Sequence, residues 1–205
     1  MIRTFLLCLL PLCFLAAAPS RAELTAPDTL VKGVTAEVLS ILHEDKAIQS
    51  GDRQRVIALI ETKIAPHFDF PRMTRLALGR AGQQASAEQF TALTGEFRTL
   101  LVRTYANSLS AYQEQTVSFR PQGKQEESDE AVVRSLINKP GTRPIPLDYR
   151  LTLTEGGWKV FDVAVSDASL VTNYRSNFAS EIEKGGIAGL LKALQDKNQL
   201  TAMAR

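Results

Sequence analysis

The chain has 205 residues, of which 44% are hydrophobic and 22% charged, and its 24 Lys and Arg nearly balance its 22 Asp and Glu. A net charge this small argues against a nucleic-acid-binding protein, because phosphates are bound by a clustered basic surface. The sequence contains no phosphate-binding glycine loop, no G-x-S-x-G nucleophile motif and no H-E-x-x-H zinc motif, so no motif of these kinds points to an enzyme.

Residues 1–22 predict a secretory signal peptide. Arg3 precedes an uncharged apolar run over residues 5–18, and the small residues Ser20 and Ala22 stand at positions −3 and −1 of a cleavage site. The apolar run has about 14 residues, whereas a membrane-spanning helix needs about 20. We therefore favour a cleaved signal over an uncleaved membrane anchor.

Cleavage leaves residues 23–205, which is enough chain for one domain with a substantial core. Both cysteines, Cys8 and Cys13, are removed with the signal peptide, so the mature chain is expected to have no disulfide and no cysteine-based site. Arg3 and Arg21 are removed as well, which leaves 22 basic and 22 acidic residues.

The first half of this domain predicts helices. Apolar residues recur on one helical face after Pro27, and a second helix is expected to have Asp52 as its cap and to end at Pro66. A short helix follows and is closed by Gly79. We expect Asp69 to cap this short helix, and we favour that role over a catalytic base with a pKa raised by its apolar neighbours.

A long helix is expected to begin at Ser86, which forms a capping-box pattern with Gln89. Its apolar stripe is wide enough to face both a sheet and another helix. The stripe comprises Phe90, Leu93, Phe97, Leu100, Leu101, Tyr105, Leu109 and Tyr112.

The second half changes to a period of two and predicts four strands. They are Thr116–Arg120, Asp129–Ile137, Pro146–Thr154 and Trp158–Val165. In the third strand only one face is apolar, so we expect an antiparallel sheet with one dry and one wet face.

The hairpin between the last two strands is expected to have the three-residue loop Glu155–Gly157 and a bulge. This register pairs Leu151 with Phe161, Tyr149 with Val163, and Leu147 with Val165 on the dry face. It also sets Arg150 opposite Asp162 on the wet face, so we interpret Asp162 as one half of a cross-strand pair rather than as a catalytic acid.

After the sheet the pattern returns to helix. Leu170, Tyr174 and Phe178 recur every four residues, and Gly185–Gly186 is expected to separate this helix from a last one. Helices, then strands, then helices in segregated order predict the α+β class.

Few residues offer chemistry. The only histidines are His43 and His67, and a zinc site built on the two of them is possible but not favoured. Four tyrosines on apolar faces each need a hydrogen-bond partner, which a cavity with a few polar points supplies more easily than a solid core. They are Tyr105, Tyr112, Tyr149 and Tyr174.

Several segments together resemble one protein family. They are Phe68–Phe70, Phe97–Tyr105, Leu147–Leu151, Gly157–Val163 and Ser169–Arg175. In these segments, in their order and spacing, the chain is similar to the MlaC or toluene-tolerance family of periplasmic phospholipid-binding proteins.

The resemblance implies both a fold and a function. The family fold is a four-stranded antiparallel sheet wrapped by helices, similar to the nuclear-transport-factor type, so residues 23–205 are expected to form a single α+β lipid-binding domain. A family member shuttles phospholipid through the periplasm between an outer-membrane lipoprotein–porin complex and an inner-membrane ABC transporter with an MCE-domain protein. Phospholipid is then the cargo, and no cofactor, metal site or catalytic residue is expected.

We expect the acyl chains to lie against apolar residues of the strands and helices. The predicted lining residues are Leu101, Tyr105, Leu109, Val133, Ile137, Tyr149, Leu151, Val163, Tyr174 and Phe178. Three alternatives stay open: a carrier of another lipid such as a hopanoid, an enzyme of the ketosteroid-isomerase type in which Asp69 would be the residue to test, and a structural protein with a solid core.

Overall fold

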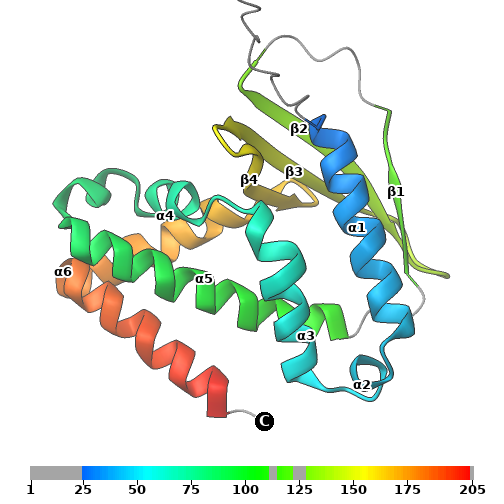
Figure 1. The fold of residues 1–205 in the computed structure, drawn as a ribbon. Helices are drawn as coiled ribbons and strands as arrows, with labels where there is room; N and C mark the ends of the chain where they lie inside the picture. Colours follow the sequence, from blue (N-terminus) through cyan, green and yellow to red (C-terminus); the bar gives the residue numbers. More distant parts are fainter. Residues whose placement is uncertain (1–24, 111–114, 122–127, 204–205) are drawn as a thin grey trace, which may run out of the picture.

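The computed structural model describes residues 25–110, 115–121 and 128–203, and its central element is an open antiparallel sheet (Figure 1). The strands lie in chain order, each hydrogen-bonded to the next. They are β1 (Thr116–Phe119), β2 (Glu130–Asn138), β3 (Ile145–Thr154), β4 (Gly157–Val165) and β5 (Ala168–Ser169). The four expected strands are thus confirmed to within one residue at each end. The expected signal peptide and Tyr112 lie outside the described residues.

The sheet has a fifth strand that the sequence analysis did not predict. β5 has only two residues, and it pairs Ala168 with Val165 and Ser169 with Ala164. Ser166 and Asp167 both have positive φ, 48° and 68°, which is the backbone of a tight two-residue hairpin turn. A strand of two residues has no periodicity to detect, and Ser-Asp is not one of the strong hairpin dipeptides.

The β3–β4 hairpin corrects the expected loop. Thr154 pairs with Gly157, so the loop has two residues instead of three, and Leu151 pairs with Val160 instead of Phe161. The expected pairs at Tyr149, Leu147 and Arg150 are nevertheless confirmed, because a bulge between Arg150 and Leu151 restores the register. The bulge places Phe161 as the extra residue on β4 and turns its side chain toward the helices.

The helices surround one side and one end of the sheet (Figure 1). They are α1 (Pro27–Glu44), α2 (Lys46–Gln49), α3 (Arg53–Leu59), α4 (Phe70–Leu78), α5 (Ala87–Ser110) and α6 (Leu170–Met203). A π-helical turn (Ile60–Ile64) and a 3₁₀ turn (Ala65–His67) extend α3, and another 3₁₀ segment (Gly79–Gln84) follows α4. The sequence analysis expected the helix to end at Pro66. In the structure, Pro66 instead lies inside the 3₁₀ turn that extends the helix. Among the described residues, no helix is both long and apolar enough to cross a membrane.

Local capping determines where these helices begin, as expected. Asp52 accepts a hydrogen bond from the Arg55 backbone N–H, and Asp69 accepts one from the Arg72 N–H at 2.9 Å. Ser86 and Gln89 form the reciprocal capping box.

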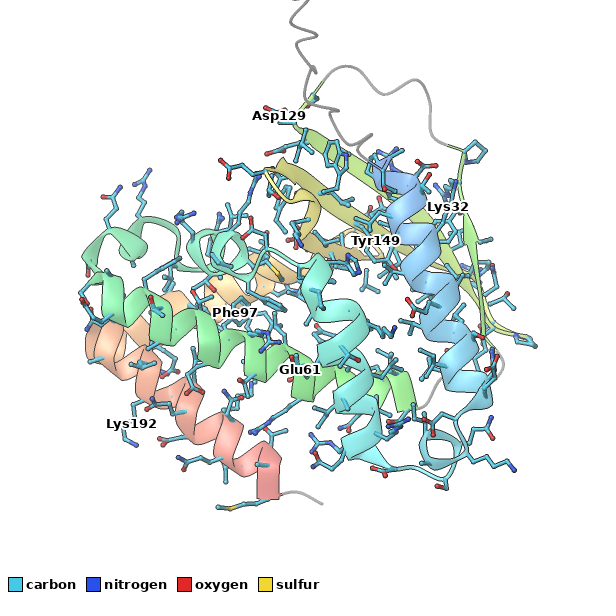
Figure 2. The ribbon with its side chains drawn as sticks, in the orientation of Figure 1. Lys32, Glu61, Phe97, Asp129, Tyr149 and Lys192 are labelled. Atoms are coloured by element: carbon cyan, nitrogen blue, oxygen red, sulfur yellow. The ribbon has the colours of Figure 1, made fainter. Side chains whose placement is uncertain are left out.

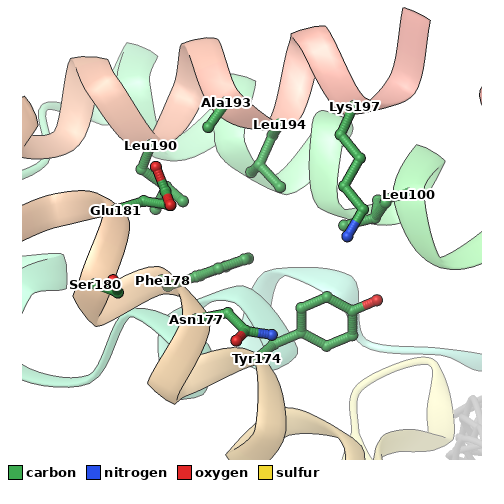
Figure 3. A pocket seen from close by; sticks show the side chains of 10 residues that line it. All are labelled: Leu100, Tyr174, Asn177, Phe178, Ser180, Glu181, Leu190, Ala193, Leu194 and Lys197. Atoms are coloured by element: carbon green, nitrogen blue, oxygen red, sulfur yellow. The ribbon is translucent and has the colours of Figure 1, made fainter. Parts of the chain in front are cut away.

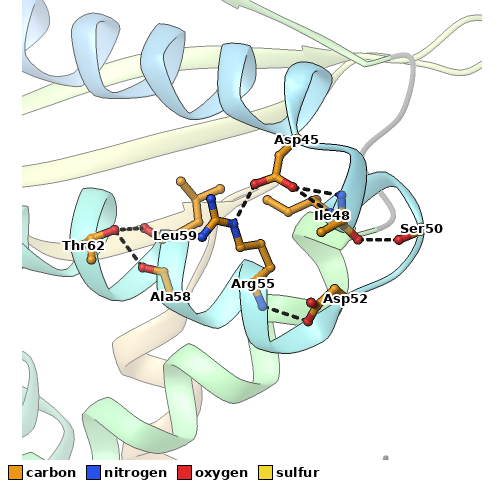
Figure 4. Close-up of polar contacts among 9 residues, drawn as sticks. Asp45, Ile48, Ser50, Asp52, Arg55, Ala58, Leu59 and Thr62 are labelled. Carbon is orange, nitrogen blue, oxygen red and sulfur yellow. Dashed lines mark hydrogen bonds and ion pairs between the residues drawn. The ribbon is translucent and has the colours of Figure 1, made fainter.

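Asp45 caps α2 and also pairs with the Arg55 guanidinium at 2.7 Å (Figure 4). This hydrogen bond, together with those from α2, lowers the pKa of the Asp45 carboxyl.

Helix α6 folds back on itself at Gly185–Gly186, where the sequence analysis expected two helices to meet. Gly186 has φ 65° and ψ −166°, a conformation that only glycine adopts readily. The second half of α6, red in Figure 1, consequently returns alongside α5. Asn198 fixes it there, because its buried amide donates to the Glu96 carbonyl oxygen at 2.9 Å.

Replacing Gly186 with alanine is expected to lower the free energy of unfolding by about 1–3 kcal/mol, the usual cost of a side chain in this backbone region. No neighbouring atom lies within 4 Å of the added Cβ, so the cost is conformational and not steric. Gly33→Ala in α1, also in open space, is the matched control and should stabilise by about 0.4–1 kcal/mol. Urea unfolding of both variants would measure these changes in the free energy of unfolding. Equal changes in the two variants would contradict the role of Gly186 as a residue that needs a glycine-only backbone conformation.

The buried apolar side chains of the described residues fall into three clusters instead of one. The first joins α4, α5 and both halves of α6, and it contains Phe97, Leu100 and Phe178. The second joins α1, α2, α3 and the end of α5 around Val56. The third joins the sheet to the start of α1 around Leu151. A domain of this size usually has one main core with smaller satellite clusters.

Candidate functional site

The dry face of the sheet changes from buried to exposed along its strands. Leu151 and Val133 are 0% and 1% exposed, whereas Ile145 and Val165 on the same face are 42% and 44% exposed. Between them, Tyr149 and Val163 pair across β3 and β4 and are half-buried. Figure 2 shows Tyr149 on the sheet and Phe97 on α5. The face expected to contact lipid is therefore mainly apolar, with the buried Ser135 as a polar member, and it is covered only in part.

The structure distributes the ten predicted lining residues over the three clusters. Val133, Tyr149, Leu151 and Val163 belong to the sheet cluster; Leu101, Tyr174 and Phe178 belong to the α4–α5–α6 cluster; Leu109 packs on the α1–α3 cluster. Ile137 is half-buried on β2, and Tyr105 is 40% exposed on α5. The ten side chains therefore do not all surround one cavity.

Tyr105 and Tyr174 bring two phenol groups close together. Burial raises the pKa of both, and the pKa of Tyr174 is raised further by Tyr105 and lowered by a hydrogen bond with Thr104. The Tyr174 ring also packs edge-on against Phe97, with ring centres 4.9 Å apart. One side of Tyr174 is therefore in the apolar cluster, and its hydroxyl lies in a polar setting.

A pocket of about 420 Å³ lies between α5 and the two halves of α6 (Figure 3). Its floor is apolar and its rim is polar. The floor comprises Leu100, Phe178, Leu190, Ala193 and Leu194, and the rim comprises Tyr174, Asn177, Ser180, Glu181 and Lys197. Only Tyr174 and Phe178 of this set were predicted as lining residues. Those on the second half of α6 were missed because that segment was expected to be a separate helix whose position the sequence does not give.

The charges on the rim are unequal. The Glu181 carboxylate is paired with the Lys184 ammonium at 2.8 Å. The Lys197 ammonium has no ion pair or hydrogen bond with any residue that the structure describes. The pocket therefore has one uncompensated positive charge above an apolar floor, which suits an amphiphile with an anionic group.

The residues considered for catalysis have structural partners. Asp69 caps α4, as expected, and its backbone N–H also donates to the Val160 carbonyl oxygen at 2.8 Å. Asp162 is buried and lies 3.8 Å from the Arg150 guanidinium, which confirms the cross-strand pair.

Among the described residues, neither His43 nor His67 belongs to a group of three or more metal-binding side chains. The pKa of His67 is lowered, mainly by burial of the imidazole and to a smaller extent by the nearby positive charge of Lys159. Within the described ranges, no group of three or more His, Cys, Asp or Glu side chains could hold a metal ion.

Comparison with known proteins gives three consistent matches. The family model described as MlaC protein matches residues 32–196. The toluene tolerance protein ttg2D of Pseudomonas putida is 24% identical over 161 residues, covering 78% of this chain and 74% of that protein. The intermembrane phospholipid transport system binding protein MlaC of Haemophilus influenzae is 23% identical over 185 residues, covering 89% of this chain and 86% of that protein.

The fold is also similar to a solved structure, that of a phospholipid-binding protein from Ralstonia solanacearum in complex with a phospholipid. The TM-score is 0.79 at 37% sequence identity, over 85% of this chain and 98% of the other. The family model covers most of the chain, and the single α+β domain agrees with the expectation from sequence. This chain belongs to the MlaC family.

Proposed function

We propose that this chain binds phospholipid and carries it through the periplasm between membranes. The observation that carries the proposal is the similarity, at 37% identity and a TM-score of 0.79, to a protein solved with a bound phospholipid. The name of the Haemophilus influenzae relative, an intermembrane phospholipid transport protein, supports the same function. The predicted signal peptide over residues 1–22 supports export.

The uncovered apolar surface provides a physical reason for this function. Val163 and Tyr149 are half-buried on the dry face, and Val165 on the same face is 44% exposed. We propose that acyl chains cover this face and contact the predicted lining residues that border it, Tyr149 and Val163 among them, with the headgroup directed outward. An outward headgroup implies little selection between headgroups.

The energetics favour exchange over release. Burying an acyl chain is worth about 0.8 kcal/mol per CH₂, so two chains of about fifteen such groups gain on the order of 20 kcal/mol. The gain is nearly the same in a bilayer as in an apolar pocket, whereas release into water would lose all of it. Loading and unloading are then near balance only when the carrier is docked to its donor or acceptor. We propose an outer-membrane lipoprotein–porin complex and an inner-membrane ABC transporter with an MCE-domain protein as these partners.

Native mass spectrometry of the chain purified from cells tests carriage directly. We expect a bound mass equal to that of phospholipid, and organic extraction should yield several headgroups in roughly the proportions of the source membrane. Protein that carries no lipid and takes none from phospholipid vesicles would refute carriage. A single headgroup in the extract would refute the outward orientation.

A further inference from the structure

The pocket between α5 and α6 has the size and polarity of a site for one acyl chain. A methylene group fills about the volume of a water molecule, ~30 Å³, so about 420 Å³ has room for roughly fourteen carbon atoms. The floor is made of leucine, alanine and phenylalanine side chains, and every polar side chain of the pocket is on the rim. A guest in this pocket therefore contacts apolar side chains on the floor and polar side chains along the rim.

Lys197 differs from Lys184 and Lys192 of the same helix, which both form ion pairs. Lys184 is paired with Glu181, and Lys192 is paired with Asp196, both at 2.8 Å. Lys197 instead reaches from the second half of α6 toward Tyr174, across the mouth of the pocket (Figure 3). The backbone at Lys197 is held against α5, because the next residue, Asn198, is buried and donates a hydrogen bond to the Glu96 carbonyl oxygen.

We infer that Lys197 binds the phosphate group of a phospholipid that has one acyl chain in the α5–α6 pocket. The phosphate is common to all phospholipids, so this contact selects phosphate-bearing lipids over neutral ones without selecting between headgroups. The amide of Asn177 lies on the same rim, beside Tyr174, and offers hydrogen-bond donors to the phosphate and ester oxygens. The inference rests on the proposed function and adds to it a pocket for one acyl chain and a residue that recognises the phosphate.

The test uses the full mature chain incubated with vesicles of phosphatidylethanolamine, phosphatidylglycerol and diacylglycerol with identical acyl chains. The bound lipids are quantified by mass spectrometry after the protein is re-isolated. Lys197→Gln is expected to lower the ratio of bound phospholipid to bound diacylglycerol by about two- to fivefold, the range for a partly exposed ion pair. The ratio between the two phospholipids should not change.

Two controls separate charge from general damage. Lys192→Gln removes an exposed lysine from the same helix and should leave all ratios at the wild-type value. Lys197→Arg keeps the charge and should retain the preference for phospholipid. A ratio in Lys197→Gln equal to that of the wild type would overturn the inference and leave carriage intact, whereas a wild-type chain that takes up none of the three lipids would overturn both.

A second pair of variants tests the floor of the pocket. Ala193 lines the pocket and is half-buried, so Ala193→Phe should fill it and reduce lipid uptake, whereas Ala188→Phe on the exposed side of the same half-helix should not. Normal uptake by Ala193→Phe would place the chain elsewhere and overturn the assignment. Free inorganic phosphate should not displace the lipid, because it cannot occupy the apolar floor; displacement would identify a site for free phosphate instead.

Discussion

Replacing Val163 with lysine is expected to leave the chain folded and to remove most of its bound phospholipid. Val163 is half-buried on the dry face of β4, opposite Tyr149. A lysine there can extend its ammonium to water, so folding is tolerated. An acyl chain on this face would have to desolvate the charge, at a cost of about 3 kcal/mol, which is roughly a hundredfold in affinity. Native mass spectrometry would measure the lost lipid, and circular dichroism would check the fold.

The control for this variant is Val132→Lys. Val132 is also a half-buried valine in a strand, but it lies beside Arg150 on the opposite face of the sheet. The Val132→Lys variant should therefore keep its bound phospholipid. Leu151 is a poorer choice, because it is fully buried and a charge there would test folding instead. If Val163→Lys carries as much lipid as Val132→Lys, the dry face of the sheet is not part of the lipid site.

Replacing Asp162 with alanine is expected to be the most destabilising single loss of a charged side chain. The buried carboxylate accepts hydrogen bonds from the Ser169 hydroxyl at 2.7 Å and from the Val171 N–H at 3.1 Å. It thereby joins β4 to the first turn of α6. Losing two such bonds from buried groups should cost about 3 kcal/mol, to which the partly exposed Arg150 adds little.

Asp148→Ala provides the comparison. Asp148 forms the other cross-strand pair, 3.5 Å from Arg134, but both side chains are partly exposed. Its removal should cost less than about 1 kcal/mol. Urea unfolding of both variants tests the difference, and similar midpoints would mean that Asp162 does not anchor α6.

Features that depend on neighbouring residues in the chain could be predicted from the sequence. Asp52, Asp69 and Ser86 cap their helices as expected, because capping bonds join residues only two or three positions apart. The register of β3 on β4 was also correct at Tyr149, since a one-residue slip would turn the apolar side chains toward water.

The place of the bulge could not be predicted in the same way. Phe161 becomes the extra residue where it meets other elements: it joins the α4–α5–α6 cluster, and the Arg72 guanidinium of α4 lies 3.8 Å above its ring. Residue 72 is far from residue 161 in the chain, and no local pattern of β3 or β4 contains this contact.

The α5–α6 pocket was missed for a similar reason. Gly185–Gly186 correctly indicated an interruption, but the angle at which the second half of α6 returns depends on Asn198 and its contact with α5. Without that angle, Lys197 is one more polar residue on a helix flank, and only its position opposite Tyr174 distinguishes it.

The separation of the interior into three clusters affects how movement can pass through the molecule. Within each cluster the side chains are tightly packed, so each tends to move as a unit. Among the described residues, Phe68 is the side chain that packs against both the sheet cluster and the α4–α5–α6 cluster. It is also held to β4 by a backbone bridge with Val160 and lies against Phe70. Any tilt of the helical part relative to the sheet must therefore repack Phe68, in addition to straining the contacts that Phe161 and Asp162 of β4 make with α4 and α6.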